Sequence, residues 1–353
     1  MAMRSILLVS WGAIVAATTC PLSVEISNVV DHNVNVTITN QGDKTVTFFK
    51  GNTVLDTRPV RKLLVQDEND DYLDFSGAYV DYKQSNPSSS MFHTLRSGQT
   101  VSTLVNAAVS HKLDGVSKAK VTALQHLKFV IGETIPSNLK DMSFCSGIAS
   151  KKVAIIPDRK KAASEHFSKI SPTSSIRRRD LGIENCSADQ QTDLQTSVND
   201  AIAMASAAQQ AEGNEDDFWI NWFKDASQAS TTDSIYSQVI NAQSTGFTIS
   251  CSDTYGACGD NGDSALAVTI TPDNVIIPCP NGGYWDLDEY AGDCDSSDYD
   301  KAGAILHEMT HLFGTSDYAY GHDDCEALAA DQAAMNADTY ELYAESVRLG
   351  GCQ

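Results

Sequence analysis

The feature that most constrains this chain is the pentapeptide H-E-M-T-H at residues 307–311. On a helix, His307 and His311 are four positions apart and share one face, so their imidazoles can bind a single ion. Glu308 is close enough to take a proton from a water molecule at that ion. Imidazole nitrogens suit Zn²⁺, and a zinc site with three protein ligands keeps a position open for water. The pentapeptide therefore predicts a buried helix, over about residues 298–313, whose ligand face lines a cleft.

The residues after this helix supply a third ligand. Gly314 is placed to end the helix in a left-handed C-cap, which turns the chain back towards the metal face. Asp317 then lies six residues beyond His311 and offers a carboxylate, in the pattern H-E-x-x-H-x-x-G-x-x-D. Tyr320 follows three residues later, where its phenol can reach across the cleft. An isolated H-E-x-x-H also occurs by chance on core helices, and the added residues favour a metal site over that alternative.

The same residues form the sequence G-T-x-D-x-x-Y-G, and the combination resembles the deuterolysins, secreted fungal zinc endopeptidases of the aspzincin group. The resemblance implies one Zn²⁺ per chain, bound by His307, His311 and Asp317. It also implies that Glu308 is the catalytic base and that Tyr320 stabilises the oxyanion. The connection from the second histidine to G-T-x-D is shorter than in deuterolysins and is similar to the metzincin spacing, with aspartate replacing the third histidine. Both templates supply the same three ligands.

Two signals of export and processing lie in the first half of the chain. Residues 4–19 have a basic start, an apolar run and an end rich in small residues, which is typical of a secretory signal peptide and too short for a membrane span. Residues 159–179 form a basic linker, rich in Ser, Thr and Pro, that ends in Arg177-Arg178-Arg179. A tribasic sequence at the end of an exposed polar segment suits a processing protease.

We therefore predict three segments: a signal peptide (1–19), a β-rich propeptide (20–179) and a zinc metalloprotease domain (180–353). Deuterolysins resemble this layout of signal, long propeptide, basic cleavage site and catalytic domain. The predicted location is secreted and extracellular.

The charge is divided unevenly between the two halves. The net charge is −21, yet only three of the 25 Lys and Arg residues follow residue 179, namely Lys224, Lys301 and Arg348. Residues 1–179 carry 22 Lys and Arg against 15 Asp and Glu, whereas residues 180–353 carry 3 against 31. Two halves of opposite net charge are expected to be two bodies that attract each other. The acidic half argues against nucleic acid as a partner and favours basic proteins as substrates; an acidic surface that serves only solubility is the alternative.

The predicted fold class is α+β, with a mostly β propeptide domain followed by a mainly helical zincin catalytic domain that contains a small antiparallel sheet. Short alternating segments from Leu22 to about Thr103 indicate an antiparallel sandwich or sheet. In zincins an edge strand aligns the substrate backbone. In the second half we predict helices at 187–209, 218–223, 232–242, 298–313, 323–334 and 338–349, and strands at 247–252, 265–271 and 274–278.

Nine cysteines in an exported chain point to disulfides, although sequence alone does not choose their connectivity. The resemblance to deuterolysins implies the pairs Cys186–Cys251, Cys258–Cys279 and Cys294–Cys352. Three cysteines remain: Cys20, Cys145 and Cys325. Cys145 either coordinates zinc and keeps a zymogen silent or bonds Cys20 or Cys325, and a buried free thiol is the alternative.

These observations predict a secreted, monomeric zinc endopeptidase made as a zymogen, whose partners are peptide substrates and its own propeptide, with no nucleic acid and no membrane. A secreted zinc-binding surface protein without turnover is the first alternative, but Glu308 and Tyr320 are not needed merely to hold metal. An independent adhesion module in the N-terminal β region is the second. Asp338 is a candidate for orienting a metal ligand, with a helix cap as the alternative. Four histidines are predicted to be surface or loop residues: His93, His111, His126 and His166.

Overall fold

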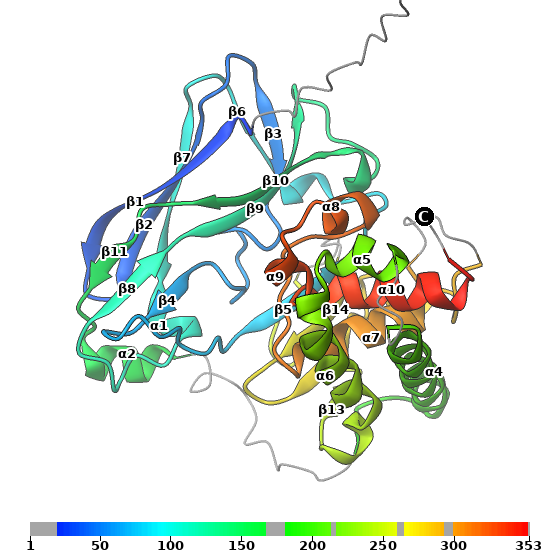
Figure 1. The fold of residues 1–353 in the computed structure, drawn as a ribbon. Coiled ribbons are helices and arrows are strands. Elements are labelled where there is room, and N and C mark those ends of the chain that lie inside the picture. The colour runs from blue at the N-terminus through cyan, green and yellow to red at the C-terminus, as the bar shows by residue number, and fades with distance from the viewer. Residues whose placement is uncertain (1–19, 167–180, 213–216, 260–264, 293–298, 352–353) are drawn as a thin grey trace, which may run out of the picture.

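The computed structural model describes residues 20–166, 181–212, 217–259, 265–292 and 299–351. We call residues 20–166 the N-terminal region and residues 181–351 the C-terminal region. The two regions lie side by side, with the strands of the first next to the helices of the second (Figure 1). The predicted signal peptide, the sequence Arg177-Arg178-Arg179 and the predicted pair Cys294–Cys352 lie outside the described residues.

Antiparallel sheets make up most of the N-terminal region, as its alternating sequence predicts. In N-V-N-V-T-I-T-N, the apolar residues Val34, Val36 and Ile38 are all buried, because alternate residues of a strand face the same side. The three sheets have the orders β1 (Leu22–Val30), β2 (Asn33–Asn40), β7 (Thr100–Asn106); β10 (Ser143–Ala149), β9 (Leu124–Ile131), β3 (Val46–Phe49), β6 (Phe92–Leu95); and β11 (Val153–Ile155), β8 (Ala119–Thr122), β4 (Leu64–Gln66).

The β structure continues well beyond the predicted limit at Thr103, to Ile155 in β11. Two short helices, α1 (Ala107–Ser110) and α2 (Arg159–Glu165), pack against each other beside it. Of the histidines predicted to be surface or loop residues, His111 and His166 lie outside the helices and strands, but the expectation that they are exposed is wrong, because both are buried.

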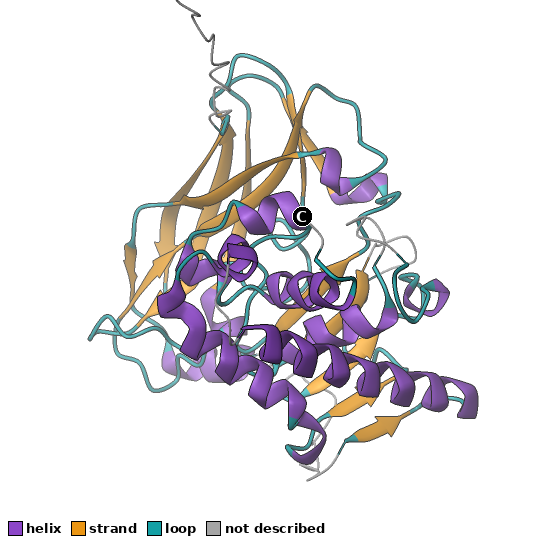
Figure 2. Ribbon diagram, turned by 45° about the vertical axis from the view of Figure 1, so that its right-hand side comes forward, coloured by secondary structure: helices purple, strands orange, loops and turns teal. Residues whose placement is uncertain are grey.

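Helices dominate the C-terminal region, and Figure 2 shows them gathered around one group of strands. The predicted helix at 323–334 is wrong as a single element: the chain is extended at Ala329, which buries Leu328 and separates two short helices. Because alanine favours helix, the sequence around residue 329 contains no local signal for the end of a helix. The helices are α4 (Ala188–Glu212), α5 (Asp217–Phe223), α6 (Ala229–Ile240), α7 (Lys301–His311), α8 (His322–Glu326), α9 (Ala330–Ala333) and α10 (Ala337–Arg348).

The sheet of the C-terminal region is mixed rather than wholly antiparallel. Its order is β12 (Gly182–Glu184), β13 (Thr248–Ser250), β15 (Val275–Pro278), β14 (Ala265–Ile270) and β5 (Ala78–Tyr82). The first three strands are parallel, and β14 is antiparallel to both of its neighbours. The α+β class is confirmed. The fifth strand, β5, comes from the N-terminal region and joins the two regions.

Three disulfides are present in the described residues: Cys20–Cys145, Cys186–Cys251 and Cys258–Cys279. The hypothesis that Cys145 coordinates zinc is wrong, because its sulfur is bonded to Cys20. Cys325 is a buried free thiol. Within the same described ranges, no helix is both long enough and apolar enough to cross a membrane.

Candidate active site and metal centre

Helix α7 carries the pentapeptide through the middle of the C-terminal region. Asp300 caps its start by accepting a hydrogen bond from the backbone N–H of Gly303 at 2.5 Å, as expected of an N-cap carboxylate. Apolar side chains on the helix, such as Ile305 and Met309, are fully buried in the core. The helix is therefore held rigidly, and its histidines are oriented by the packing of the faces around them.

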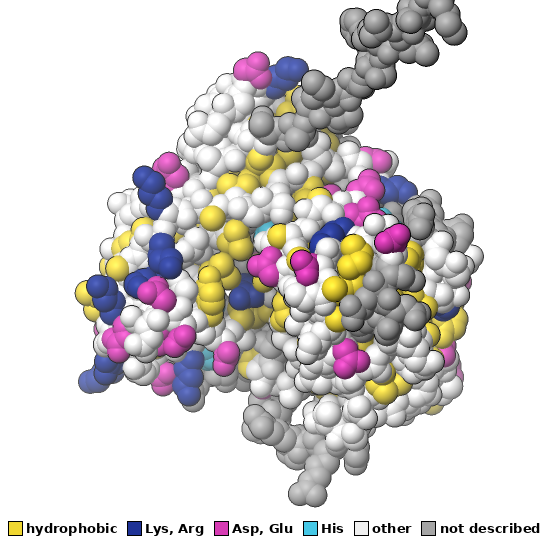
Figure 3. Space-filling model, in the orientation of Figure 1, with side chains coloured by type: hydrophobic (Ala, Val, Ile, Leu, Met, Phe, Trp, Pro, Cys, Tyr) yellow, Lys and Arg dark blue, Asp and Glu magenta, His cyan; other side chains and the backbone are white. Residues whose placement is uncertain are grey.

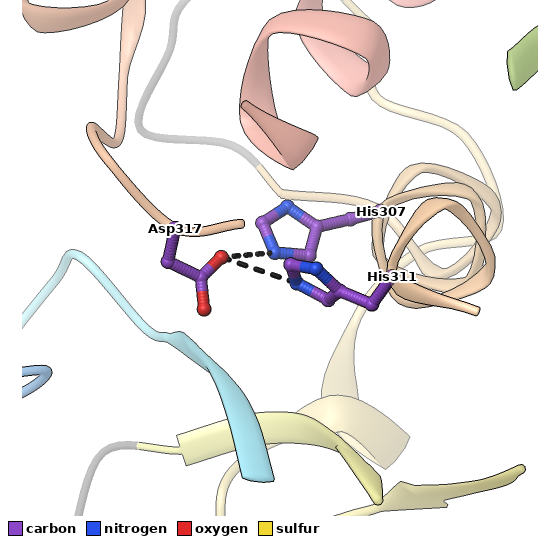
Figure 4. A group of neighbouring side chains, drawn as sticks. All are labelled: His307, His311 and Asp317. Carbon is purple, nitrogen blue, oxygen red and sulfur yellow. Dashed lines mark hydrogen bonds and ion pairs between the residues drawn. The ribbon is translucent and has the colours of Figure 1, made fainter. Parts of the chain in front are cut away.

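The three predicted ligands converge on one point (Figure 4). Oδ1 of Asp317 lies 3.2 Å from Nε2 of His307 and 3.1 Å from Nε2 of His311. All three side chains are at most 4% exposed. Tetrahedral Zn²⁺ with ligands at 2.0–2.1 Å places neighbouring ligand atoms about 3.3 Å apart. Two imidazole nitrogens and one carboxylate oxygen at this spacing fit a zinc ion.

The turn after α7 brings Asp317 back to the helix. Gly314 has φ +101°, a left-handed value that favours glycine, and its N–H donates to the carbonyl of His311 at 3.2 Å. The predicted C-cap is therefore confirmed. Thr315 lies in the same turn, and its carbonyl oxygen and hydroxyl are both 3.2 Å from Nδ1 of His311. These contacts point the other ring nitrogen of His311, Nε2, at Asp317.

His307 is oriented from the opposite side by two carboxylates of α10. Nδ1 of His307 lies 3.2 Å from Oε2 of Glu341 and 3.5 Å from Oδ1 of Asp338. Carboxylates in this position fix the orientation and tautomer of a metal-binding histidine. The position of Asp338 fits its predicted orienting role. A role for Glu341 was not predicted, although Glu341 lies three residues after Asp338 on a predicted helix, which places both side chains on one face.

A glycine allows α7 and α10 to come this close. A Cβ atom on Gly303 would lie 2.7 Å from Oε1 of Glu341 and 2.9 Å from Oδ1 of Asp300, which is closer than such atoms pack. Gly303 therefore leaves the space that Glu341 needs to reach His307.

Oppositely charged groups in the site stabilise each other's charged forms. Burial by itself would lower the pKa of His307, but the carboxylates of Asp317, Asp338 and Glu341 outweigh it and raise that pKa. Burial would likewise raise the pKa of Asp317, yet the two imidazoles hold it below its usual value. The site thus keeps Asp317 ionised, as a metal ligand must be.

Glu308 and Tyr320 lie beside the three ligands. The side chain of Glu308 is fully buried, and its Oε2 accepts a hydrogen bond of 2.5 Å from the hydroxyl of Thr269 on β14. Burial raises the pKa of Glu308 well above its usual range. The Tyr320 ring stacks on His307 at a centroid distance of 6.0 Å, and its hydroxyl donates to the carbonyl of Val80 at 2.7 Å.

Comparison with known proteins agrees with this geometry. Residues 4–351 match the deuterolysin metalloprotease (M35) family. A neutral protease 2 homolog of Arthroderma gypseum is 30% identical over 345 residues, which cover 93% of this chain and 91% of the relative. A probable neutral protease 2 homolog B of Trichophyton rubrum is 28% identical over 344 residues, with 93% and 91% covered. The chain belongs to the deuterolysin (M35) family and is a zinc metalloprotease.

Proposed function

We propose that this protein is a secreted zinc endopeptidase made as a zymogen, with residues 20–179 as propeptide and residues 180–353 as the monomeric catalytic domain. The observation that carries the proposal is the convergence of His307, His311 and Asp317 beside a buried glutamate. Disulfides and family membership support export. We retain the predicted Cys294–Cys352 bridge and cleavage after Arg177-Arg178-Arg179 as parts of the proposal.

One Zn²⁺ per chain would be held by His307, His311 and Asp317. Bound there, it would lower the pKa of a water molecule to about 7 and polarise the scissile carbonyl. Glu341 and Asp338 would hold His307 in the tautomer whose Nε2 is free to bind the metal.

Glu308 would accept the proton of the attacking water and pass it to the leaving amine. Its Oε1 has no hydrogen-bond partner among the described residues, whereas Oε2 is fixed by Thr269. One oxygen is thus anchored and the other is free to take a proton.

Tyr320 would stabilise the oxyanion that forms on the scissile carbonyl. Its hydroxyl already donates to a peptide carbonyl, that of Val80, at 2.7 Å. Stacking on His307 holds the Tyr320 ring in this direction. Its hydroxyl would therefore need little reorganisation when negative charge develops on the oxygen of the scissile carbonyl.

The zymogen part of the proposal is supported by the burial of the site. His307 and Glu308 are fully buried, and His311 is 2% exposed. In the proposed zymogen, the N-terminal region would keep substrate from these side chains. Cleavage of the linker would allow the N-terminal region to leave.

We propose basic proteins as preferred substrates, because the C-terminal region is strongly acidic. On the face drawn in Figure 3, most Lys and Arg side chains lie over the N-terminal strands. Removal of the N-terminal region would therefore leave a more acidic molecule.

The processed chain and its Glu308→Ala variant, incubated with casein and protamine, provide the test. Both are expected to hold one zinc, and only the wild type is expected to cleave. Equal activity of the two would refute the role of Glu308. Zinc binding without cleavage by either would favour a zinc-binding surface protein.

A further inference from the structure

The sequence Asn35-Val36-Thr37 on β2 is an acceptor pattern for N-linked glycosylation, and the proposed peptidase activity does not use it. The pattern requires an asparagine, then any residue except proline, then serine or threonine. Asn86 fails because a proline follows it. Asn185 fits, but the cysteine after it forms a disulfide with Cys251. Asn35 is therefore the acceptor that neither a proline nor a disulfide obstructs.

Asn35 lies in the middle of β2, on the face of its sheet that is turned away from the core. Its neighbours Val34 and Val36 are buried, and successive residues of a strand point to opposite faces, so Asn35 points outward. Asn35 and Thr37 are both partly exposed. The Thr37 hydroxyl lies 2.8 Å from the hydroxyl of Ser102 on β7, at the surface. The acceptor pattern therefore remains accessible in the folded chain.

The side-chain amide of Asn35 is loosely held. Its Nδ2 donates a long hydrogen bond of 3.4 Å to the hydroxyl of Ser27 on β1, at an exposed position. A bond of this length in contact with water contributes little to stability. An N-glycosidic bond replaces one of the two N–H groups of the amide, and the other can still donate. A sugar attached to Nδ2 is therefore compatible with the fold of the sheet.

Exposed apolar side chains lie beside Asn35. In the pairing of β2 with β7, Leu104 is directly opposite Asn35, which places their Cβ atoms about 4.5–5.5 Å apart on one face of the sheet. Leu104 is 67% exposed. Val30, at the end of β1, is 64% exposed and pairs with Asn33, two positions before Asn35. Apolar groups gathered at a protein surface normally have a cover or a partner. An oligosaccharide on Asn35 would lie over these side chains.

The sheet that carries Asn35 lies on the side of the N-terminal region that is turned away from the C-terminal region. In Figure 1 its strands β1, β2 and β7 are at the left, and the helices of the C-terminal region are at the right. A bulky group on the outer face of this sheet would leave the contacts between the two regions undisturbed. Glycosylation at Asn35 is therefore compatible with the proposed zymogen.

We propose that Asn35 carries an N-linked oligosaccharide, added during export, that covers Leu104. The inference rests on the export that forms part of the proposed function. In the transfer, Nδ2 of Asn35 forms a bond to the anomeric carbon of an oligosaccharide linked to a lipid diphosphate. The bond between that carbon and the diphosphate breaks, the lipid diphosphate leaves with the bonding electrons, and the amide loses one proton. The glycan then belongs to the N-terminal region and leaves with it after processing.

The test is to secrete the full-length chain from a yeast host, treat it with peptide-N-glycosidase and map its peptides by mass. The wild type should lose the mass of an oligosaccharide, and the treatment should convert the amide at position 35 to a carboxyl group. Asn35→Gln and Thr37→Ala should remove the glycan from this site. Asn33→Gln is the matched control, because it makes the same change on the same face of β2, outside the acceptor pattern.

Removal of the glycan from the folded wild type tests the cover over Leu104. The deglycosylated chain should aggregate at least about twofold faster on heating, as measured by light scattering, because an apolar side chain becomes accessible. Leu104→Ser, compared with and without its glycan, should show a smaller difference. This comparison separates the cover over one side chain from the general effect of a sugar on solubility.

The outcomes distinguish the glycan from the export on which it rests. A secreted chain whose Asn35 is unmodified, including one that carries a glycan at Asn185 alone, would overturn the inference and leave the proposed peptidase intact. A chain that stays in the cytosol, bare at Asn35, would refute both the glycan and the proposed export. Equal aggregation of the glycosylated and deglycosylated wild type would show that the sugar does not cover Leu104.

Discussion

At the scale of single residues, a few side chains of the site are proposed to do chemistry, and others orient them. Tyr320 illustrates the first group, because its hydroxyl is the one group proposed to stabilise the oxyanion from the protein side. Glu341 illustrates the second, because it contacts His307 and makes no proposed contact with substrate. Substitutions at the two positions should therefore have separable effects.

Replacing Tyr320 with Phe in the processed enzyme should lower kcat about 10²–10³-fold, the range found for loss of one oxyanion donor. KM and zinc content should change little, because the phenyl ring of the variant keeps the position in which the Tyr320 ring stacks on His307. Steady-state kinetics with a peptide substrate, together with metal analysis, checks this. A kcat within twofold of the wild type would remove Tyr320 from the mechanism.

Replacing Glu341 with Gln should instead weaken zinc affinity about 10–100-fold, because a neutral amide holds His307 less firmly than a carboxylate does. The kcat of the fully metallated variant should stay within a few-fold of the wild type. Chelator competition followed by kinetics at saturating zinc separates the two effects. Unchanged affinity would show that Asp338 alone orients His307.

At the scale of elements, the site depends on the close approach of α7 and α10. Gly303→Ala tests this approach. In a solvent-exposed helix, replacing glycine with alanine stabilises the helix by about 1 kcal/mol. Here, however, the added Cβ would lie 2.7 Å from Oε1 of Glu341. We expect a net loss of unfolding free energy of about 1–3 kcal/mol, typical of overpacking. Denaturant unfolding measures it, with Gly292→Ala as the control, since among the described residues no atom beyond the chain neighbours lies within 4 Å of a Cβ placed there. A Gly303→Ala variant as stable as the wild type would contradict the packing argument.

Local features of the site could be predicted from the sequence, whereas contacts between distant elements could not. The ligands His307, His311 and Asp317 were predictable because one helical turn and one glycine cap set their spacing locally. Thr269 and Tyr79 were not, because their contacts with Glu308 and His311 join segments that are far apart in the chain. The pairing of β5 with β14 is a contact of the same kind, and the short run A-Y-V-D-Y does not show which partner it will choose.

At the scale of the whole molecule, the N-terminal region carries buried histidines that make its stability depend on pH. Burial, assisted by the charge of Arg61, lowers the pKa of His111 to about 3, and burial lowers the pKa of His126 to about 4. His166 is the other ionisable group close to His111. In the unfolded chain a histidine titrates near 6.5, so the unfolded state binds protons first as the pH falls.

The unfolding free energy should therefore decrease as the pH falls from about 6.5 towards 4. Each buried histidine contributes a slope of about 1.4 kcal/mol per pH unit. Urea unfolding of the full chain at several pH values, compared with His111→Asn, checks this. In the variant, the slope of the unfolding free energy against pH should be smaller by the contribution of one histidine, although the variant is less stable at pH 7. An identical slope in both proteins would show that His111 is accessible to protons in the folded state.

Two histidines of α7 and the aspartate after its glycine cap are proposed to share one zinc ion. The most direct measurement is anomalous X-ray diffraction at the zinc absorption edge from crystals of the full-length protein. We expect a single strong peak within about 2.0–2.2 Å of Nε2 of His307, Nε2 of His311 and Oδ1 of Asp317. A zinc-loaded crystal without a peak there, or with the Asp317 carboxylate turned away from both imidazoles, would contradict it.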